Sequence, residues 1–186
     1  PLVGVKPRSG HHLHFMAFEL GRSPDGRWWV LNDRTQAPAG AGFALENRVA
    51  STRIYSDLYE EANVLRLAGF FRLFRESLLR MRPDGEGHAA ILTPGTHTPT
   101  YYEHAYIARY LGLMLVEGED IIFQNGKPMV RTVAGAQPVS VLWRRLDSHF
   151  ADPLEMREEG SLIGVPGLVG AVRRQQISLA NELGAG

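Results

Sequence analysis

The stretch from Ala89 to Gly112 decides the fold class, and it reads AAILTPGTHTPTYYEHAYIARYLG. A short apolar run at 89–93, followed by Pro and Gly, is typical of a buried strand that ends in a loop. Residues 101–111 carry apolar side chains at helical spacing, and Gly112 is a typical helix stop. A second apolar run follows at 113–116. The order strand, helix, strand predicts parallel strands in an α/β layer.

The C-terminal side extends this layer. Residues 121–123 and 129–132 flank Asn125-Gly126, a dipeptide that favours a type I′ hairpin turn. Residues 139–143 predict a further strand, and the pieces 166–173 and 178–183 have helix-like patterns. We therefore expect a mixed α+β chain of the α/β class.

The N-terminal side predicts a β hairpin followed by helices. Two apolar runs, 12–20 and 27–33, flank the turn sequence Ser23-Pro24-Asp25-Gly26, so we interpret the first fifty residues as β. The run APAGAG at 37–42 predicts a loop whose backbone amides face a ligand. One helix is expected from Ser56 and another over 68–81, and residues 82–87 break the pattern.

Composition narrows the classes of function. The 186 residues carry 20 Lys+Arg and 20 Asp+Glu, so the formal net charge is zero, and cysteine is absent. A nucleic-acid-binding domain normally has a basic excess, so we expect no nucleic-acid partner. A chain without cysteine has no disulfide scaffold and no thiolate metal site, which fits a cytoplasmic location. No apolar run approaches the ~20 residues of a membrane helix, so we expect no membrane partner.

The loop between the first strand and the helix is one candidate site. In parallel layers, ligands bind beyond the carboxyl ends of the strands, and a helix N-terminus favours anions. This loop carries four threonines and His97. Arg144 and Arg145, directly after a strand, are suited to a carboxylate or phosphate. An ordinary capped turn and a surface ion pair are the alternative explanations of these two features.

Two side-chain pairs near the hairpin have the chemistry of metal ligands. Glu19 and Asp33 lie on opposing strands, and a shared face would bring together two carboxylates suited to Mg²⁺. His12 and His14 share one face of a strand, which suits a metal if a third ligand arrives. In both cases, polar strand residues that face solvent are the alternative.

Four blocks of sequence together resemble one family. Residues 25–48 read DGRWWVLNDRTQAPAGAGFALENR, which resembles the segment DGxxxVLEDNxRxPSGxxYxLENR of circularly permuted ATP-grasp proteins. Three later blocks are similar to blocks of that family in the same order: ILTPGTHTPTYYEHAYIARYLGLMLVEGEDI, VLWRRLDSHFADPLE and GVPGLVGAVRRQQISLANELGAG. The resemblance extends from about residue 2 to residue 186.

The resemblance implies an ATP-dependent carboxylate–amine ligase that acts through an acyl phosphate. ATP and Mg²⁺ are the implied cofactors, and small-molecule or peptide-like carboxylates and amines are the implied substrates. Residues 1–50 would then be part of an ATP-grasp lobe, 51–86 a helical connector, and 87–186 a Rossmann-like pre-ATP-grasp domain. The other nucleotide-binding parts would lie outside these residues, so we expect an incomplete and inactive site in this chain alone.

The resemblance also implies roles for individual residues. Glu19 and Asp33 would hold Mg²⁺, and Gly40, Gly42 and Asn47 would line the nucleotide side. The residues that would face substrate are Thr93, Gly95, His97, Tyr101, Glu103, Arg144, Arg145 and Asn181.

The sequence departs from the family at its Mg²⁺-binding positions. Asn32 and Arg34 stand where the family has Glu and Asn, and a guanidinium cannot ligate a metal ion. Gln36 stands where the family has an arginine. Two hypotheses follow: Glu19 and Asp33 form a shifted metal site, or the protein is a non-catalytic homologue that serves as a binding or scaffolding module.

Overall fold

The structure is a computed structural model, which describes residues 2–156 and 163–185. Residues 157–162, which belong to the domain expected at 87–186, lie outside the described residues. The elements follow in this order: β1 (Ala17–Arg22), β2 (Trp28–Arg34), α1 (Ala41–Ile54), α2 (Ser56–Glu61), α3 (Ala68–Arg80), β3 (His88–Leu92), α4 (Tyr101–Leu111), β4 (Met114–Val116), β5 (Ile121–Gln124), β6 (Lys127–Thr132), β7 (Gly135–Arg144), α5 (Leu168–Arg173) and β8 (Ser178–Ala180).

A six-stranded sheet forms the body of the molecule, in the order β4-β3-β7-β6-β5, with β8 beside β7. Strand β3 runs parallel to β4 and β7, and β8 is parallel to β7. The N-terminal half of β7 instead pairs antiparallel with β6, which forms a hairpin with β5. The mixed α/β class, the parallel layer and the Asn125-Gly126 hairpin are thereby confirmed.

Alternation along β3 and β7 divides the apolar core into two layers. Side chains of Ala90 and Leu142 belong to one cluster, which includes α5, whereas Ile91 and Trp143 belong to the other, which includes α3 and α4. Successive strand residues point to opposite faces of a sheet, so a strand covered on both faces is continuously apolar. This arrangement leaves the carboxyl ends of β3 and β7 between the two helical layers.

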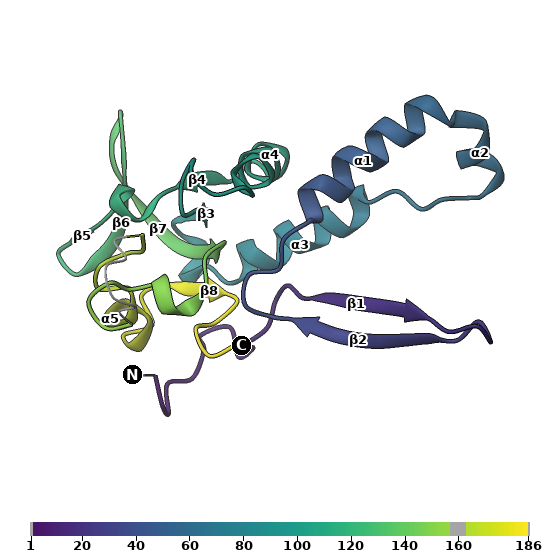
Figure 1. Cartoon of the computed structure of the whole chain (residues 1–186). Helices are drawn as coiled ribbons and strands as arrows, with labels where there is room; N and C mark the ends of the chain where they lie inside the picture. The colour runs from purple at the N-terminus through teal and green to yellow at the C-terminus, as the bar shows by residue number, and fades with distance from the viewer. Residues whose placement is uncertain (1, 157–162, 186) are drawn as a thin grey trace.

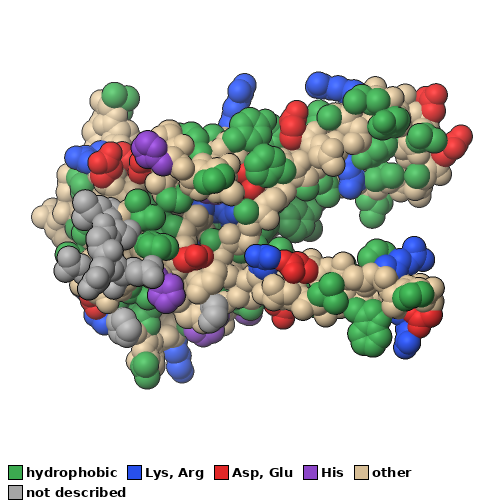
Figure 2. All heavy atoms as spheres, in the orientation of Figure 1, with side chains coloured by type: hydrophobic (Ala, Val, Ile, Leu, Met, Phe, Trp, Pro, Cys, Tyr) green, Lys and Arg blue, Asp and Glu red, His purple; other side chains and the backbone are tan. Residues whose placement is uncertain are grey.

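Two arms extend from the body on the same side, as Figure 1 shows: the β1–β2 hairpin and the helical arm of α1, α2 and the start of α3. The space between the arms is open in the space-filling view of Figure 2. One face of the hairpin carries Phe18, Leu20, Trp28 and Val30, which are between 52% and 65% exposed.

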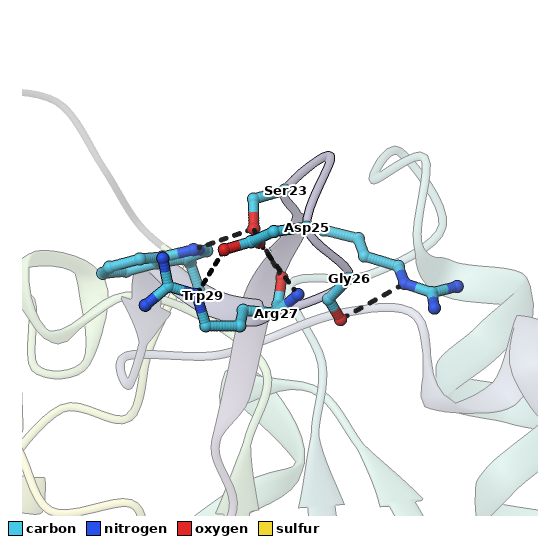
Figure 3. A network of polar contacts seen from close by, with 6 residues as sticks. Ser23, Asp25, Gly26, Arg27 and Trp29 are labelled. Carbon is cyan, nitrogen blue, oxygen red and sulfur yellow. Dashed lines mark hydrogen bonds and ion pairs between the residues drawn. The ribbon is translucent and has the colours of Figure 1, made fainter.

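The tip of the hairpin confirms the predicted turn (Figure 3). The backbone N–H of Gly26 donates to the Ser23 carbonyl, and Gly26 has a φ of 83°, which glycine adopts without strain. The Asp25 carboxylate accepts from Ser23 and Arg27, and these contacts lower its pKa. The indole N–H of Trp29 donates to the Ser23 hydroxyl at 3.3 Å.

Three expectations about secondary structure are wrong. Residues 41–50 are helical, not β; the pattern failed because α1 buries only Gly42 and Leu45 and so lacks a continuous apolar stripe. Residues 178–180 form strand β8 and not a helix, since periodicity does not distinguish a short, fully buried run. His12 and His14 precede β1, so they do not share a strand face.

Candidate functional site

A cavity of about 450 Å³ lies beyond the carboxyl ends of β3 and β7, at the start of α4. Its wall comes from four parts of the chain that meet at this edge of the sheet. The lining residues are Ala37, Ala39, Pro94, His97, Thr98, Thr100, His104, Arg145, Leu146, Asp147, Phe150 and Ile163. The cavity lies where open α/β sheets bind ligands, as predicted for the loop 93–100.

The sheet fixes the floor of this cavity. The backbone N–H of Thr93 donates to the Val116 carbonyl at 2.9 Å, and the backbone N–H of Arg145 donates to the Leu92 carbonyl at 2.8 Å. The Thr93 hydroxyl and His104 Nδ1 share a hydrogen bond of 2.9 Å. Burial, with a smaller contribution from the Arg145 charge, lowers the pKa of His104 to about 4. His104 is therefore a neutral polar group of the wall near pH 7.

Arg145 is the cation of the cavity. Its side chain is 2% exposed, and its guanidinium lies 5.0 Å from the centre of the Trp143 ring. Its Nη2 donates to the Pro38 carbonyl at 2.8 Å and lies 3.6 Å from Glu103 Oε1. Nη1 has no acceptor among the described residues. Burial lowers the pKa of Arg145, and the Glu103 charge opposes that shift.

A buried cation with an unpartnered donor makes this cavity a candidate binding site. A buried N–H without an acceptor costs about 1–3 kcal/mol, and more on a charged group, so such donors are rare unless a ligand or water satisfies them. Because Arg145 lines the cavity, an anionic group there would meet a buried guanidinium that the protein holds in place.

Residues 35–40 are fastened across the strand ends by side chains of the body. The Asn181 side-chain amide donates to the Thr35 carbonyl at 2.6 Å, and the Ser148 hydroxyl donates to Gln36 Oε1 at 2.8 Å. Arg145 Nη2 donates to the Pro38 carbonyl at 2.8 Å. The Gly40 N–H donates to Glu103 Oε2, also at 2.8 Å. The segment that connects the hairpin to α1 thereby forms one wall of the cavity.

Gly40 and Gly42 help to hold this segment and α1 against α4. The Gly40 amide is engaged by the fully buried Glu103, so the expectation that it faces a ligand is wrong. A Cβ on Gly42 would lie 2.7 Å from Glu103 Cγ, so only glycine allows α1 to approach α4 this closely. Asn47 lies exposed on α1.

Two of the residues expected to face substrate are directed into the protein. Arg144 is fully buried and donates to the carbonyls of Asn181, Leu146 and Glu182 at 2.7–2.8 Å. Burial lowers its pKa to about 10. Asn181 accepts from the backbone N–H groups of residues 14 and 15 and donates to the carbonyls of residues 15 and 35. Both therefore hold segments of the chain together.

Besides Arg145, one of the other residues expected to face substrate lines the cavity, and the rest lie outside its lining. His97 is exposed and lines the cavity. Gly95 lies behind it with a φ of 102°, and its amide donates to the Thr93 hydroxyl. Tyr101 begins α4 but does not line the cavity, and Glu103 lies behind Arg145.

The hairpin carboxylates do not form the expected pair. Asp33 lies opposite Phe18 and Glu19 lies opposite Asn32, so alternation directs Glu19 and Asp33 to opposite faces. The shared face expected for them is wrong. Arg34, which stands at an expected metal position, donates to Glu19 through both Nε and Nη2. Across residues 2–156 and 163–185, no cluster of three His, Asp or Glu side chains is placed to hold a metal ion.

Sequence patterns predicted the segments 37–42 and 93–100 and Arg145 of the cavity wall, but missed the rest of its lining. No local pattern marks Phe150 and Ile163, which also line it. His104 follows the candidate loop in the sequence and lies one helical turn after Thr100, the residue that precedes α4.

Comparison with known proteins identifies the family. The family described as "Circularly permuted ATP-grasp type 2" matches residues 1–186. The chain belongs to this family. ATP-grasp proteins are ATP-dependent and ligase-like in kind, and the blocks quoted above lie within the matched range.

The similar proteins are much longer than this chain. An uncharacterized protein of Synechocystis sp. is 36% identical over 191 residues, which cover all of this chain and 39% of that protein. Two uncharacterized proteins of Mycobacterium tuberculosis are 37% and 33% identical, and the chain covers 21% and 34% of their lengths. The matches include 98% and 99% of this chain. None of the described helices is long and apolar enough to cross a membrane.

Proposed function

We propose that this chain is the centre of an ATP-dependent carboxylate–amine ligase, and that the strand-end cavity holds the carboxylate substrate. The observation that carries the proposal is Arg145, a buried cation that lines the cavity and whose Nη1 has no acceptor among the described residues. Family membership supports the ATP-dependent, ligase-like kind of chemistry. The substrates proposed are small-molecule or peptide-like carboxylates and amines.

In the proposed reaction, the carboxylate oxygen attacks the γ-phosphorus of ATP, forming the acyl phosphate and breaking the bond to the β-phosphate oxygen, so that ADP leaves. The amine nitrogen then attacks the acyl carbon, the C–O bond to phosphate breaks, and inorganic phosphate leaves. The amine proton passes to solvent. This chain would bind and orient the carboxylate through Arg145, with Glu103 and the Pro38 carbonyl holding the guanidinium in place.

The residues described here do not fit a complete Mg²⁺ site. Glu19 is paired with Arg34, and Asp33 lies on the opposite face of the hairpin. We therefore assign no step of the reaction to a metal ion bound by this chain. In this proposal, residues 1–50 belong to an ATP-grasp lobe, 51–86 to a connector and 87–186 to a pre-ATP-grasp domain, with the nucleotide-binding parts supplied by the full-length protein, which we place in the cytoplasm.

The test is an ADP-release assay on the full-length protein, with panels of amino acids and short peptides as carboxylate and amine. We expect turnover that requires both substrates. His97→Ala, which changes an exposed cavity residue, should raise KM for the carboxylate and leave KM for ATP unchanged. The matched control is His88→Ala, at the opposite end of β3, which should behave as wild type. Absence of ATP binding by the folded full-length protein in calorimetry would refute the ligase.

A second candidate is a non-catalytic homologue that acts as a binding or scaffolding module. The ion pair between Arg34 and Glu19 favours it, because it occupies a position where family members carry metal ligands. Turnover by the full-length protein that is lost in Asp33→Ala would exclude this candidate. Ligand binding to the cavity without any ATP turnover would support it.

A further inference from the structure

A second cavity, of about 720 Å³, lies in the helical arm. Residues of α1, α2 and the segment 63–67 before α3 line it, and these segments lie at the upper right of Figure 1. Tyr110 of α4 closes one side. None of the described residues lines both this cavity and the strand-end cavity, so the two are separate. The volume lies within the ~300–1,000 Å³ that is typical of small-molecule sites.

One wall of the arm cavity is apolar. It combines aliphatic side chains with two tyrosine rings, and its members are Leu45, Val49, Val64, Leu65, Leu67, Ala68, Tyr59 and Tyr110. Leu45 is 5% exposed, whereas Leu65 is 82% exposed and has little protein packed against it. Helix α2 buries no residue. The wall is therefore an apolar surface that an occupant of the cavity would cover.

The polar part of the cavity is cationic. Among the described residues, three arginines and one carboxylate, that of Glu60, line it. Arg48 is fixed: its Nη1 donates to the Leu65 carbonyl at 2.6 Å, and its guanidinium lies 5.7 Å from the centre of the Tyr59 ring. In the described part of the chain, Arg53 and Arg66 form no ion pair or hydrogen bond. The cavity thus combines an apolar wall with two exposed arginines that pair with no described residue.

We infer that the arm cavity binds a small amphipathic anion. Its aromatic or alkyl body covers the wall around Leu45 and Leu65, and its one carboxylate, sulfonate or phosphate contacts Arg53 and Arg66. The guanidinium group suits each of these anions, because its planar donors match their oxygen atoms. This binding is independent of the ligase reaction and of the strand-end cavity.

Two naphthalene dyes test this inference on the full-length protein by fluorescence titration. One is 8-anilinonaphthalene-1-sulfonate, and the other is N-phenyl-1-naphthylamine, which has the same body without the charge. We expect the sulfonate to bind at one site. The double variant Arg53→Gln/Arg66→Gln should weaken it by roughly fivefold, the order expected for two partly exposed charge contacts. The uncharged dye should bind both proteins equally.

Two further variants test whether the dyes bind in the arm cavity and not on the exposed apolar face of the hairpin. Val64→Trp changes a partly exposed wall residue to a larger one, so both dyes should lose binding while the circular dichroism spectrum is retained. The matched control, Arg80→Gln/Arg109→Gln, removes two exposed charges that do not line the cavity and should leave the affinity unchanged.

Competition distinguishes the possible sources of the anion. Octanoate and octyl phosphate, as monomers, should displace the sulfonate dye; the stronger competitor identifies the preferred head group. The inference is overturned if the full-length protein binds no sulfonate dye, or if the charge-removal and Val64→Trp variants bind it as the wild type does. Displacement by phosphatidylglycerol vesicles but by neither monomer would also overturn it, because the occupant would then be a membrane surface.

Discussion

The buried pair of Glu103 and Arg145 allows a quantitative prediction about stability. Their side chains are 0% and 2% exposed, and 3.6 Å separates Glu103 Oε1 from Arg145 Nη2. In Glu103→Gln, the amide oxygen still accepts from Gly40 N–H, but Arg145 becomes a buried cation without a counter-charge. Removal of one partner of a buried pair costs about 3–5 kcal/mol, and the retained Gly40 contact reduces this to about 2–4 kcal/mol of unfolding free energy.

The assay is a double-mutant cycle by urea unfolding of the full-length protein, with Glu103→Gln, Arg145→Gln and both together. Because the second change removes the uncompensated charge, the double variant should be more stable than the sum predicts, by about 2 kcal/mol. The control is Glu76→Gln, which breaks the exposed pair with Arg72 and should cost at most about 0.5 kcal/mol. Additive costs at residues 103 and 145 would refute the coupling that we infer.

Three more predictions concern single residues. Burial raises the pKa of Glu182 from 4.5 to about 7, so between these values the folded state binds a proton that the unfolded state has lost. Stability therefore falls as pH rises through 7, by about 2–3 kcal/mol. In urea unfolding, Glu182→Gln should lack this pH-dependent loss. Gly42→Ala should lower stability by about 1–3 kcal/mol in thermal unfolding, because its Cβ would meet Glu103 Cγ at 2.7 Å. Asn181→Ala should speed amide hydrogen exchange at Phe15 more than at the strands of the sheet, since its carboxamide binds both backbone groups there.

Local sequence patterns predicted the body of the fold well. The run from residue 89 to 116 contains its own strand, turn, helix stop and second strand, and the structure pairs β3 with β4 in parallel as expected. The loop at its centre was predicted as a candidate site because the position of a ligand follows from the direction of the strands, and its residues do line the strand-end cavity. Arg145 was found for the same reason, since it directly follows β7.

Long-range contacts decided what the sequence could not. Arg144 and Arg145 are adjacent and chemically identical, yet one binds three carbonyls inside the protein and the other lines the cavity, because strand alternation separates them. The hairpin register escaped prediction because both faces are rich in apolar residues, so patterning specifies the register weakly. The contact of Glu103 with the Gly40 amide joins two helix starts that no local pattern connects.

The central claim is that Arg145 binds the carboxylate substrate in the strand-end cavity. Steady-state kinetics of full-length Arg145→Lys tests it most directly, because lysine keeps the charge but loses the planar fork of donors. A hydrogen bond to a charged group contributes about 1.5–3 kcal/mol, so KM for the carboxylate should rise by roughly tenfold or more. KM for ATP should stay within about twofold. An unchanged KM for the carboxylate in a folded, active Arg145→Lys protein would contradict the claim.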